Sequence, residues 1–337
     1  MTNKTVLVTG ANGYLGRAVC HIFSLSGWTV YGLVRSQEKA TGLALDEITP
    51  IIGSSSDLSF LSDKLQDTVF DVIVSTTEDL GNYTPHFESI LELVKAVSGT
   101  AKKHGKKPLL LFTSGSKDTG ESGLEGSPDF VVHDETTPDN NQVKIIAPRT
   151  ENAPRVFNYQ DQFHGVVIRP TPLYGHSGSF YGQLFHSFTT NQPGQSIVIY
   201  GDPKTVWHGV HVDDCARAYE LLASQFYQCS EKVHGQIFLI GNEKWDTVGD
   251  IVEGLRKVYG ERKVEWMTPD PNNQFQTLMA HSQAICADKM RALGWTTKKP
   301  ALVDSIDVYV AAWEEAMRME DARAKKMLEM VNLVLKE

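Results

Sequence analysis

Three glycines near the start of the chain have the spacing of a phosphate-binding turn. Gly10, Gly13 and Gly16 follow the apolar run 6–8 and precede apolar residues at helical spacing. A strand, a glycine turn and a helix in this order present free backbone N–H groups to an anion, and the helix dipole favours negative charge there. A mere turn is the alternative. The stretch predicts a dinucleotide pyrophosphate site formed by Thr9, Gly10, Asn12, Gly13, Tyr14, Leu15 and Gly16.

Each glycine has its own mechanical role in such a site. Gly10 makes the tight turn, Gly13 lets the backbone approach the pyrophosphate, and Gly16 lets the helix pack closely on the sheet. The helix after Gly16 and the strand before Gly10 therefore have to be held in contact.

A basic residue ends the second expected strand, at 29–34. The end of this strand faces the adenosine ribose, where an acidic residue binds the 2′-hydroxyl of NAD and an arginine accommodates the 2′-phosphate of NADP. Arg35 stands there, and its guanidinium can pair bidentately with a phosphate. The alternative is a solvated surface arginine. Arg35 therefore favours NADP as the cofactor.

The chain resembles the extended branch of the short-chain dehydrogenase/reductase superfamily, which is similar to NAD-dependent epimerases and dehydratases. The resemblance rests on the glycine spacing after Thr9, on Arg-Pro-x-x-x-Tyr-Gly at 169–175 and on Val-His-Val-Asp-Asp at 210–214. It spans roughly residues 5–296. It implies an α/β fold: a Rossmann-type doubly wound parallel sheet with a smaller C-terminal substrate lobe.

The resemblance also implies further cofactor contacts. Gly53-Ser54 stands where the family has a Gly-Asp pair at the adenine, which removes one contact. The family keeps His-x-Ala-Ala beside the nicotinamide ribose, where this chain has small hydroxylic residues. By resemblance, the residues along the cofactor are Ser54, Ser75, Thr76, Thr113, Pro170 and Leu173.

One family motif is missing. The family has a Tyr-x-x-x-Lys pair in which the tyrosine is the acid/base and the lysine lowers its pKa. With Glu151 as anchor, Val143 and Ala147 stand in those positions, and residues 140–165 hold no such pair. Free tyrosine ionises near pH 10, so another group has to supply the proton. Arg149 and Lys144 lie nearby, and we interpret both as ordinary surface charges.

Four residues are candidates for catalysis. Ser114 is the first choice and Ser116 the second, because both follow the fifth strand, where the family keeps the hydroxyl that bonds the substrate oxygen. The alternative is that serine and glycine there simply make a turn. Tyr174 and His176 are candidate acids, since a histidine titrates near neutrality without help. Structural packing is the alternative for both, and it is the favoured interpretation for Tyr174.

These residues need a sheet and helices to position them. Further strands are expected at 49–52 and 69–74, and others are expected to begin near residues 108, 166 and 236. Helices are expected at 89–104, 179–190 and 247–255, with one long helical tail over 301–335.

The expected domain boundaries follow from these elements. Residues 1–178, joined by about 206–241, form the dinucleotide-binding domain; 179–205 and 242–300 form the substrate lobe, and 301–337 the tail. Residues 118–141 are polar and predict a long surface loop of the kind that serves as a lid or binding loop.

Composition narrows the class of protein. The 337 residues are 41% hydrophobic and 22% charged, as in an ordinary soluble protein, and the net charge of −9 argues against nucleic-acid and anionic-membrane binding. The four cysteines are scattered without metal-site spacing, which indicates reduced packing residues and a cytoplasmic protein. No metal is expected. The tail leaves a homodimer open.

The residues together predict an atypical NADP-dependent oxidoreductase acting on a small carbonyl or hydroxyl compound. Ser114 would polarise the substrate oxygen, and the proton would come from His176, Tyr174 or water. Two alternatives stay open: a non-redox isomerase, cyclase or dehydratase on the same fold, and a non-catalytic NADP-binding sensor.

Overall fold

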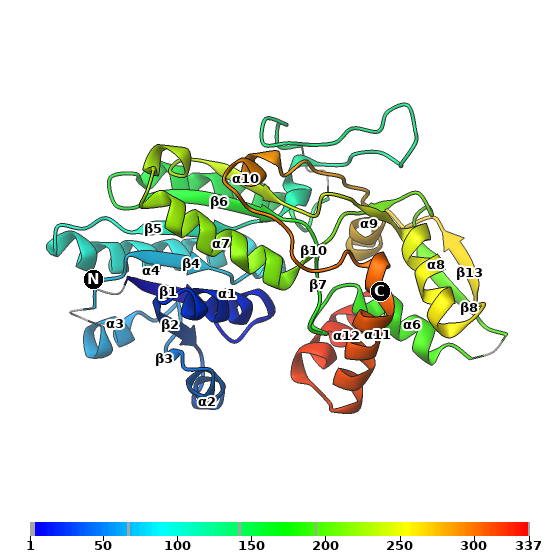
Figure 1. The fold of residues 1–337 in the computed structure, drawn as a ribbon, viewed down its shortest axis with the longest axis horizontal. Helices are drawn as coiled ribbons and strands as arrows, with labels where there is room; N and C mark the ends of the chain where they lie inside the picture. Colours follow the sequence, from blue (N-terminus) through cyan, green and yellow to red (C-terminus); the bar gives the residue numbers. More distant parts are fainter. Residues whose placement is uncertain (1–3, 66–67, 141–142, 193, 336–337) are drawn as a thin grey trace.

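A parallel sheet of seven strands forms the centre of the computed structural model, which describes residues 4–65, 68–140, 143–192 and 194–335 (Figure 1). The strand order is β11-β6-β5-β4-β1-β2-β3, and each neighbouring pair is parallel. The strands are β1 (Thr5–Thr9), β2 (Thr29–Val34), β3 (Thr49–Ile52), β4 (Val72–Ser75), β5 (Leu109–Thr113), β6 (His164–Pro170) and β11 (Ile237–Ile240).

Apolar side chains cover both faces of this sheet because successive residues of a strand point to opposite sides. Val6 and Val8 pack with α1 (Tyr14–Leu25) and α7 (Val212–Phe226), whereas Leu7 packs with α4 (Tyr83–Lys103). Helices therefore lie on both faces, and the doubly wound fold expected from the sequence is confirmed. The remaining helices of this part are α2 (Gln37–Leu45), α3 (Ser59–Lys64), α5 (Ala147–Asn152) and α10 (Asp288–Ala292).

A separate hydrophobic core holds the C-terminal lobe together. It gathers buried side chains of α6 (Gly182–Thr190), α8 (Val248–Tyr259) and α11 (Ile306–Arg318), with Trp313 fully buried among them. These helices lie together on the right of Figure 1. The lobe also contains α9 (Gln274–Ala280) and the pairs β8 (Ser196–Tyr200) with β13 (Lys263–Met267), and β9 (Val206–Trp207) with β12 (Asp246–Thr247); β7 (Leu173–Tyr174) pairs with β10 (Val210–His211).

The tail is two helices, so the prediction of one long helix over 301–335 was wrong. Helix α11 ends before Glu320, which has a left-handed φ of 58°, and α12 (Ala322–Leu335) follows. The Asp321 carboxylate accepts the N–H groups of Arg323 and Ala324, at 2.9 and 3.3 Å, and so starts the new helix. Residues 336–337 and most side chains of 327–335 lie outside the described residues, and the homodimer stays a prediction.

The segment predicted as a surface loop over 118–141 is anchored at several points, and its first residue is not at the surface. Asp118 is fully buried, on the turn η2 (Ser116–Thr119). Further on, His133 N donates to Ala284 O, and Glu135 accepts the N–H of Leu239 on edge strand β11. The segment therefore covers that edge and ties it to the C-terminal lobe; Asn141 lies outside the described residues.

The glycine turn has the geometry that its spacing indicates. Gly10 has a left-handed φ of 67°, and Gly13 N donates to Gly10 O at 2.8 Å. A Cβ added to Gly16 would lie 2.2 Å from Gly10 O and 2.7 Å from Thr76 Oγ1. Helix α1 therefore reaches the ends of β1 and β4 only because position 16 has no side chain. No helix in the described part of the chain is both long and apolar enough to cross a membrane.

Replacing Gly16 tests this contact. Gly16→Ala forces a methyl group against backbone, and we expect the free energy of unfolding to fall by about 1–3 kcal/mol. The matched variant is Gly99→Ala, at an exposed position of α4 where the new methyl meets nothing within 4 Å. Its free energy of unfolding should rise by about 0.5–1 kcal/mol. Urea denaturation measures both, and equal responses of the two variants would contradict the close contact.

Candidate cofactor and active site

Helix α1 begins at the end of β1 with its first turn open to a ligand. Gly13 is the N-cap residue, and within the described chain no side chain caps this helix end. Thr76 Oγ1 donates to Thr9 O at 2.7 Å, which holds the exit of β4 beside the glycine turn. The backbone N–H groups of the first turn and the helix dipole therefore favour an anion at this point.

Hydroxyl groups at the carboxyl ends of four strands are buried without a hydrogen-bond partner among the described residues. Such groups are rare, because each costs about 1–3 kcal/mol when it stays unpaired. Their position at one edge of a parallel sheet is where ligands bind in this class of fold. The atoms are Thr9 Oγ1, Ser75 Oγ, Thr77 Oγ1, Ser116 Oγ and Thr171 Oγ1.

Two of the predicted cofactor residues have hydroxyls that are held by the protein. Tyr14 donates to the carbonyl oxygen of Gly175, and its ring lies against Gly178. Thr113 donates to Ser75 O and bonds the hydroxyl of Tyr219 on α7, at 2.8 Å. Both side chains therefore fix the surrounding backbone.

The other predicted cofactor residues lie along the same sheet edge. Arg35 is exposed at the end of β2, and Ser54, partly exposed after β3, bonds Ser56. Pro170 is buried at the end of β6. Asn12 and Leu173 are partly buried, and Leu15 is in the core.

A buried ion network occupies the end of β5. The Ser114 hydroxyl donates to Asp118, whose other oxygen accepts from Arg149 Nε at 2.9 Å. Arg169 Nε lies 3.3 Å from Asp118, and both Arg side chains are almost fully buried. Gly115 is required here, because a Cβ at this position would lie 2.6–2.8 Å from the Arg149 guanidinium.

Further carboxylates balance the two arginines. Arg149 Nη1 pairs with Glu78 at 2.9 Å, and Arg169 makes a bidentate pair with Asp139 at 2.6 and 2.7 Å. Thr150 donates to Asp118 at 3.2 Å. Bidentate, charge-assisted contacts of this kind fix geometry as well as charge.

The network stands close to where the family's Tyr and Lys would be. Val143 precedes α5 and Ala147 begins it, so the positions of the missing pair fall at the start of this helix. The surface interpretation of Arg149 was wrong: two residues into α5 it is buried, because Asp118 and Glu78 balance its charge. Lys144 is exposed, as expected.

The two candidate acids are also engaged. Tyr174 is buried, donates to Pro300 O and accepts from Asn242 Nδ2, each at 2.9 Å, and burial raises its pKa far above the ordinary value. His176 is exposed, and its Nε2 lies 3.0 Å from both oxygens of Asp213. Their catalytic roles stay predictions.

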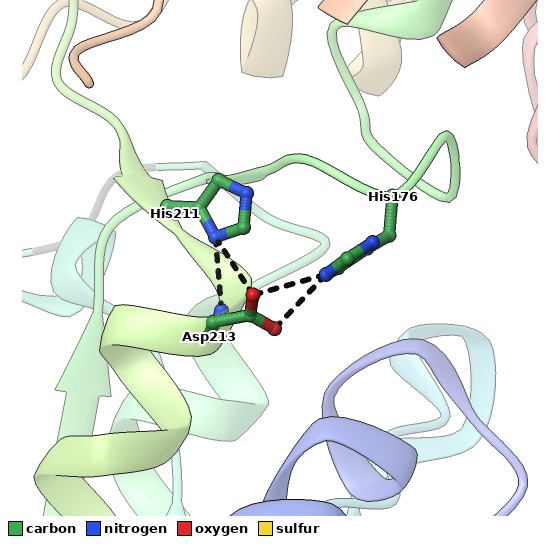
Figure 2. Close-up of side chains that lie close together, drawn as sticks. All are labelled: His176, His211 and Asp213. Carbon is green, nitrogen blue, oxygen red and sulfur yellow. Dashed lines mark hydrogen bonds and ion pairs between the residues drawn. The ribbon is translucent and has the colours of Figure 1, made fainter. Parts of the chain in front are cut away.

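Figure 2 shows His176 and His211 on either side of the Asp213 carboxylate. The three ligand atoms lie within 4.8 Å of one another, a spacing that suits a metal ion. However, His211 Nδ1 accepts the N–H of Asp213, at 3.1 Å, and thereby caps α7. Lys299 Nζ lies 3.3 Å from the same carboxylate and supplies positive charge. We therefore interpret the cluster as the capped start of α7.

Sequence reasoning missed a second group beside the network. Lys117, partly exposed on η2, donates to the carbonyl oxygen of His281 at 2.7 Å. Gln283 Nε2 donates to Ser116 O at 2.6 Å. Lys117 adjoins the predicted serines and could have been noticed on that ground, whereas nothing in the sequence distinguishes residues 281–283.

Comparison with known proteins identifies the family. Residues 6–241 match the profile of the NAD dependent epimerase/dehydratase family. The chain belongs to this family. It is 24% identical over 231 residues to an uncharacterised protein of Saccharomyces cerevisiae, across 66% of this chain and 74% of the relative.

Solved structures share the fold of this epimerase/dehydratase family member. The dTDP-glucose 4,6-dehydratase of Bacillus anthracis, in complex with NAD, has a TM-score of 0.70 and 19% identity over 93% of this chain and 97% of its own. The UDP-glucose 4-epimerase of Thermus thermophilus, also with NAD, has a TM-score of 0.69 and 17% identity over 93% and 99%. At these identities the likeness concerns the fold alone.

The residues of this family member fit a nicotinamide dinucleotide. Gly10 and Gly13 carry no side chain of their own, which lets their backbone approach a pyrophosphate closely. The unpaired hydroxyls of Ser75 and Thr171 lie further along the same strand ends, where the ribose and nicotinamide would need hydrogen bonds. When bound, the group supplies a hydride acceptor or donor.

The ion network makes a sharp stability prediction. Arg149→Met leaves Asp118 buried beside one cation fewer, and we expect the free energy of unfolding to fall by about 3–5 kcal/mol. Arg318→Met removes an exposed ion pair on α11 and should leave stability within experimental error. Urea denaturation compares the two, and a small loss for Arg149→Met would mean that Asp118 does not need this partner.

Proposed function

We propose that this chain is an NADP-dependent oxidoreductase acting on a small carbonyl or hydroxyl compound, with an acid/base group different from that of its family. The observation that carries the proposal is the open N-terminus of α1 beside unpaired buried hydroxyls at the strand ends. A site for a long polar cofactor explains both the anion-binding helix end and the row of unpaired donors, whereas a simple turn explains neither.

Arg35 supports NADP over NAD. Its side chain is exposed at the end of β2, and residues 35–37 include no acid to accept a hydrogen bond from a ribose 2′-hydroxyl. A guanidinium at this point binds a 2′-phosphate through two parallel charge-assisted hydrogen bonds.

The two serines after β5 have unequal roles in this proposal. Ser114 holds Asp118, so its hydroxyl is committed to the ion network. Ser116 Oγ is buried without a partner within the described residues. We therefore give Ser116, the second candidate of the sequence analysis, the task of donating a hydrogen bond to the substrate oxygen, and Ser114 the task of holding Asp118.

A non-redox isomerase, cyclase or dehydratase is the second candidate. It is favoured by the Asp118–Arg149 pair, since a fixed carboxylate–guanidinium pair beside the cofactor positions a substrate without transferring a proton. A non-catalytic NADP-binding sensor is the third candidate. Nucleotide binding is common to all three, and turnover separates the first two from the last.

Nucleotide titration tests the proposal. Energy transfer from tryptophan to the nicotinamide measures binding. We expect NADPH to bind more tightly than NADH. Arg35→Ala should weaken NADPH binding about tenfold or more, because it removes hydrogen bonds to a charged phosphate, and should leave NADH nearly unchanged. Arg318→Ala, an exposed arginine on α11, is the control.

Two outcomes contradict this proposal. Failure of the wild-type chain to bind either nucleotide removes the oxidoreductase. Equal loss of NADPH and NADH affinity in Arg35→Ala removes the specific role of Arg35 at the 2′-phosphate.

A further inference from the structure

Lys117 connects the end of β5 with the C-terminal lobe. It follows Ser116 directly on η2, and its Nζ donates to the carbonyl oxygen of His281 at 2.7 Å. Lys117 is partly exposed, and burial of its ammonium lowers its pKa. Lys117 thus stands at the junction of the sheet edge with the second lobe.

Three buried polar atoms beside Lys117 have no hydrogen-bond partner among the described residues. They are Ser116 Oγ, His281 Nε2 and Gln283 Oε1, and their side chains belong to residues only 1%, 2% and 3% exposed. Gln283 is held in place by its amide nitrogen, which donates to Ser116 O and to Thr119 Oγ1 at 2.6 and 3.0 Å. Three unpaired buried atoms on residues that contact Lys117 or Ser116 indicate a polar ligand that pairs with them.

We propose that Lys117 is the catalytic proton donor of this protein and that Ser116, His281 and Gln283 bind the oxygens of a small polar carbonyl substrate. The inference rests on the proposed oxidoreductase function and supplies the acid that the missing Tyr-x-x-x-Lys pair leaves open. The ligand class follows from the atoms: a hydroxyl donor, a ring nitrogen and an amide oxygen pair with carbonyl and hydroxyl groups.

The charges around Lys117 suit this role. Burial lowers the pKa of its ammonium to about 7; the nearby Arg149 lowers the pKa further, and Glu121 opposes the change. Burial also strongly lowers the pKa of His281, which faces Lys117, His133 and Arg149 and is therefore neutral. An acid with a pKa near the working pH transfers protons most effectively.

The proposed step balances in atoms and charge. The carbonyl carbon accepts a hydride from a reduced nicotinamide dinucleotide, and the C=O π pair moves to oxygen. Lys117 gives one proton to that oxygen, so the product is an alcohol and the lysine becomes a neutral amine. Solvent then returns the proton to the amine. Ser116 donates a hydrogen bond to the same oxygen throughout.

The first test measures the titration of Lys117 directly. Acetic anhydride labels only neutral amines, and mass spectrometry of peptides gives the labelling of each lysine as a function of pH. We expect labelling of Lys117 to reach half its maximum near pH 7, as its pKa predicts, about three pH units below the ordinary value for a lysine side chain. A midpoint of Lys117 near the ordinary value for a lysine side chain, or no labelling below about pH 9, overturns the proposal.

The second test separates proton transfer from structure. The probes are glyceraldehyde, dihydroxyacetone and diacetyl with NADPH. Because Lys117 acts as an acid, kcat/KM of the wild type should fall as pH rises through about 7. Both Lys117→Met and Lys117→Arg should lose about a hundredfold or more of kcat/KM. Methionine has no proton to donate, and a guanidinium does not titrate near neutrality. A purely structural lysine would be rescued by Lys117→Arg, which keeps the charge and a donor.

The controls distinguish this inference from the proposed function. Lys117→Met should bind NADPH within about twofold of the wild type, and Lys144→Met should keep full activity. Loss of NADPH binding in the wild type itself defeats the proposed function. If the wild type binds NADPH normally, either of two results defeats the assignment of Lys117 and its substrate class. The Lys117→Arg variant is active, or the wild type turns over none of the probes.

Discussion

The pairing of buried Asp118 with Arg149 and Arg169 is the constraint on which the rest of the candidate site depends. An isolated carboxylate in a dry interior is very costly, so each partner has to be held in position. Asp118 follows β5, Arg149 lies on α5 and Arg169 on β6, so one charge ties three elements together. The same demand fixes Gly115, since the Arg149 guanidinium lies on its backbone.

This arrangement changes what the region can do chemically. A solved structure of similar fold is a complex with NAD. In this chain, Val143 before α5 and Ala147 at its start stand at the positions where the sequence analysis expects the tyrosine and the lysine. The ion network stabilises a rigid turn after β5 and uses the hydroxyl of Ser114 to do so. Ser116 and Lys117 lie between Ser114 and Asp118 in this turn and contact Gln283 and His281.

The two halves of the site depend on different physics. At the glycine turn, the close approach of α1 to β1 leaves backbone N–H groups free, so we expect affinity for a pyrophosphate to come from the main chain. At the end of β5 the proposed binding groups are side chains whose positions are set by charge pairing and by contacts with residues 281–283. Both halves lie at the carboxyl ends of parallel strands, and the unpaired hydroxyl of Ser75, at the end of β4, lies between them.

The doubly wound sheet came from the family resemblance that the sequence motifs carry. The sequence by itself also determined β2 and β3 at the expected residues, the glycine turn, and the lack of a Tyr-x-x-x-Lys pair within residues 140–165. These follow from local patterns: strand alternation, helical spacing and motif composition act over a few residues. Only the tertiary structure decided that Arg149 is buried, that Lys117 meets His281, and that the tail divides at Glu320. The first two depend on contacts between residues far apart in the chain, and burial and charge compensation exist only once those residues are brought together.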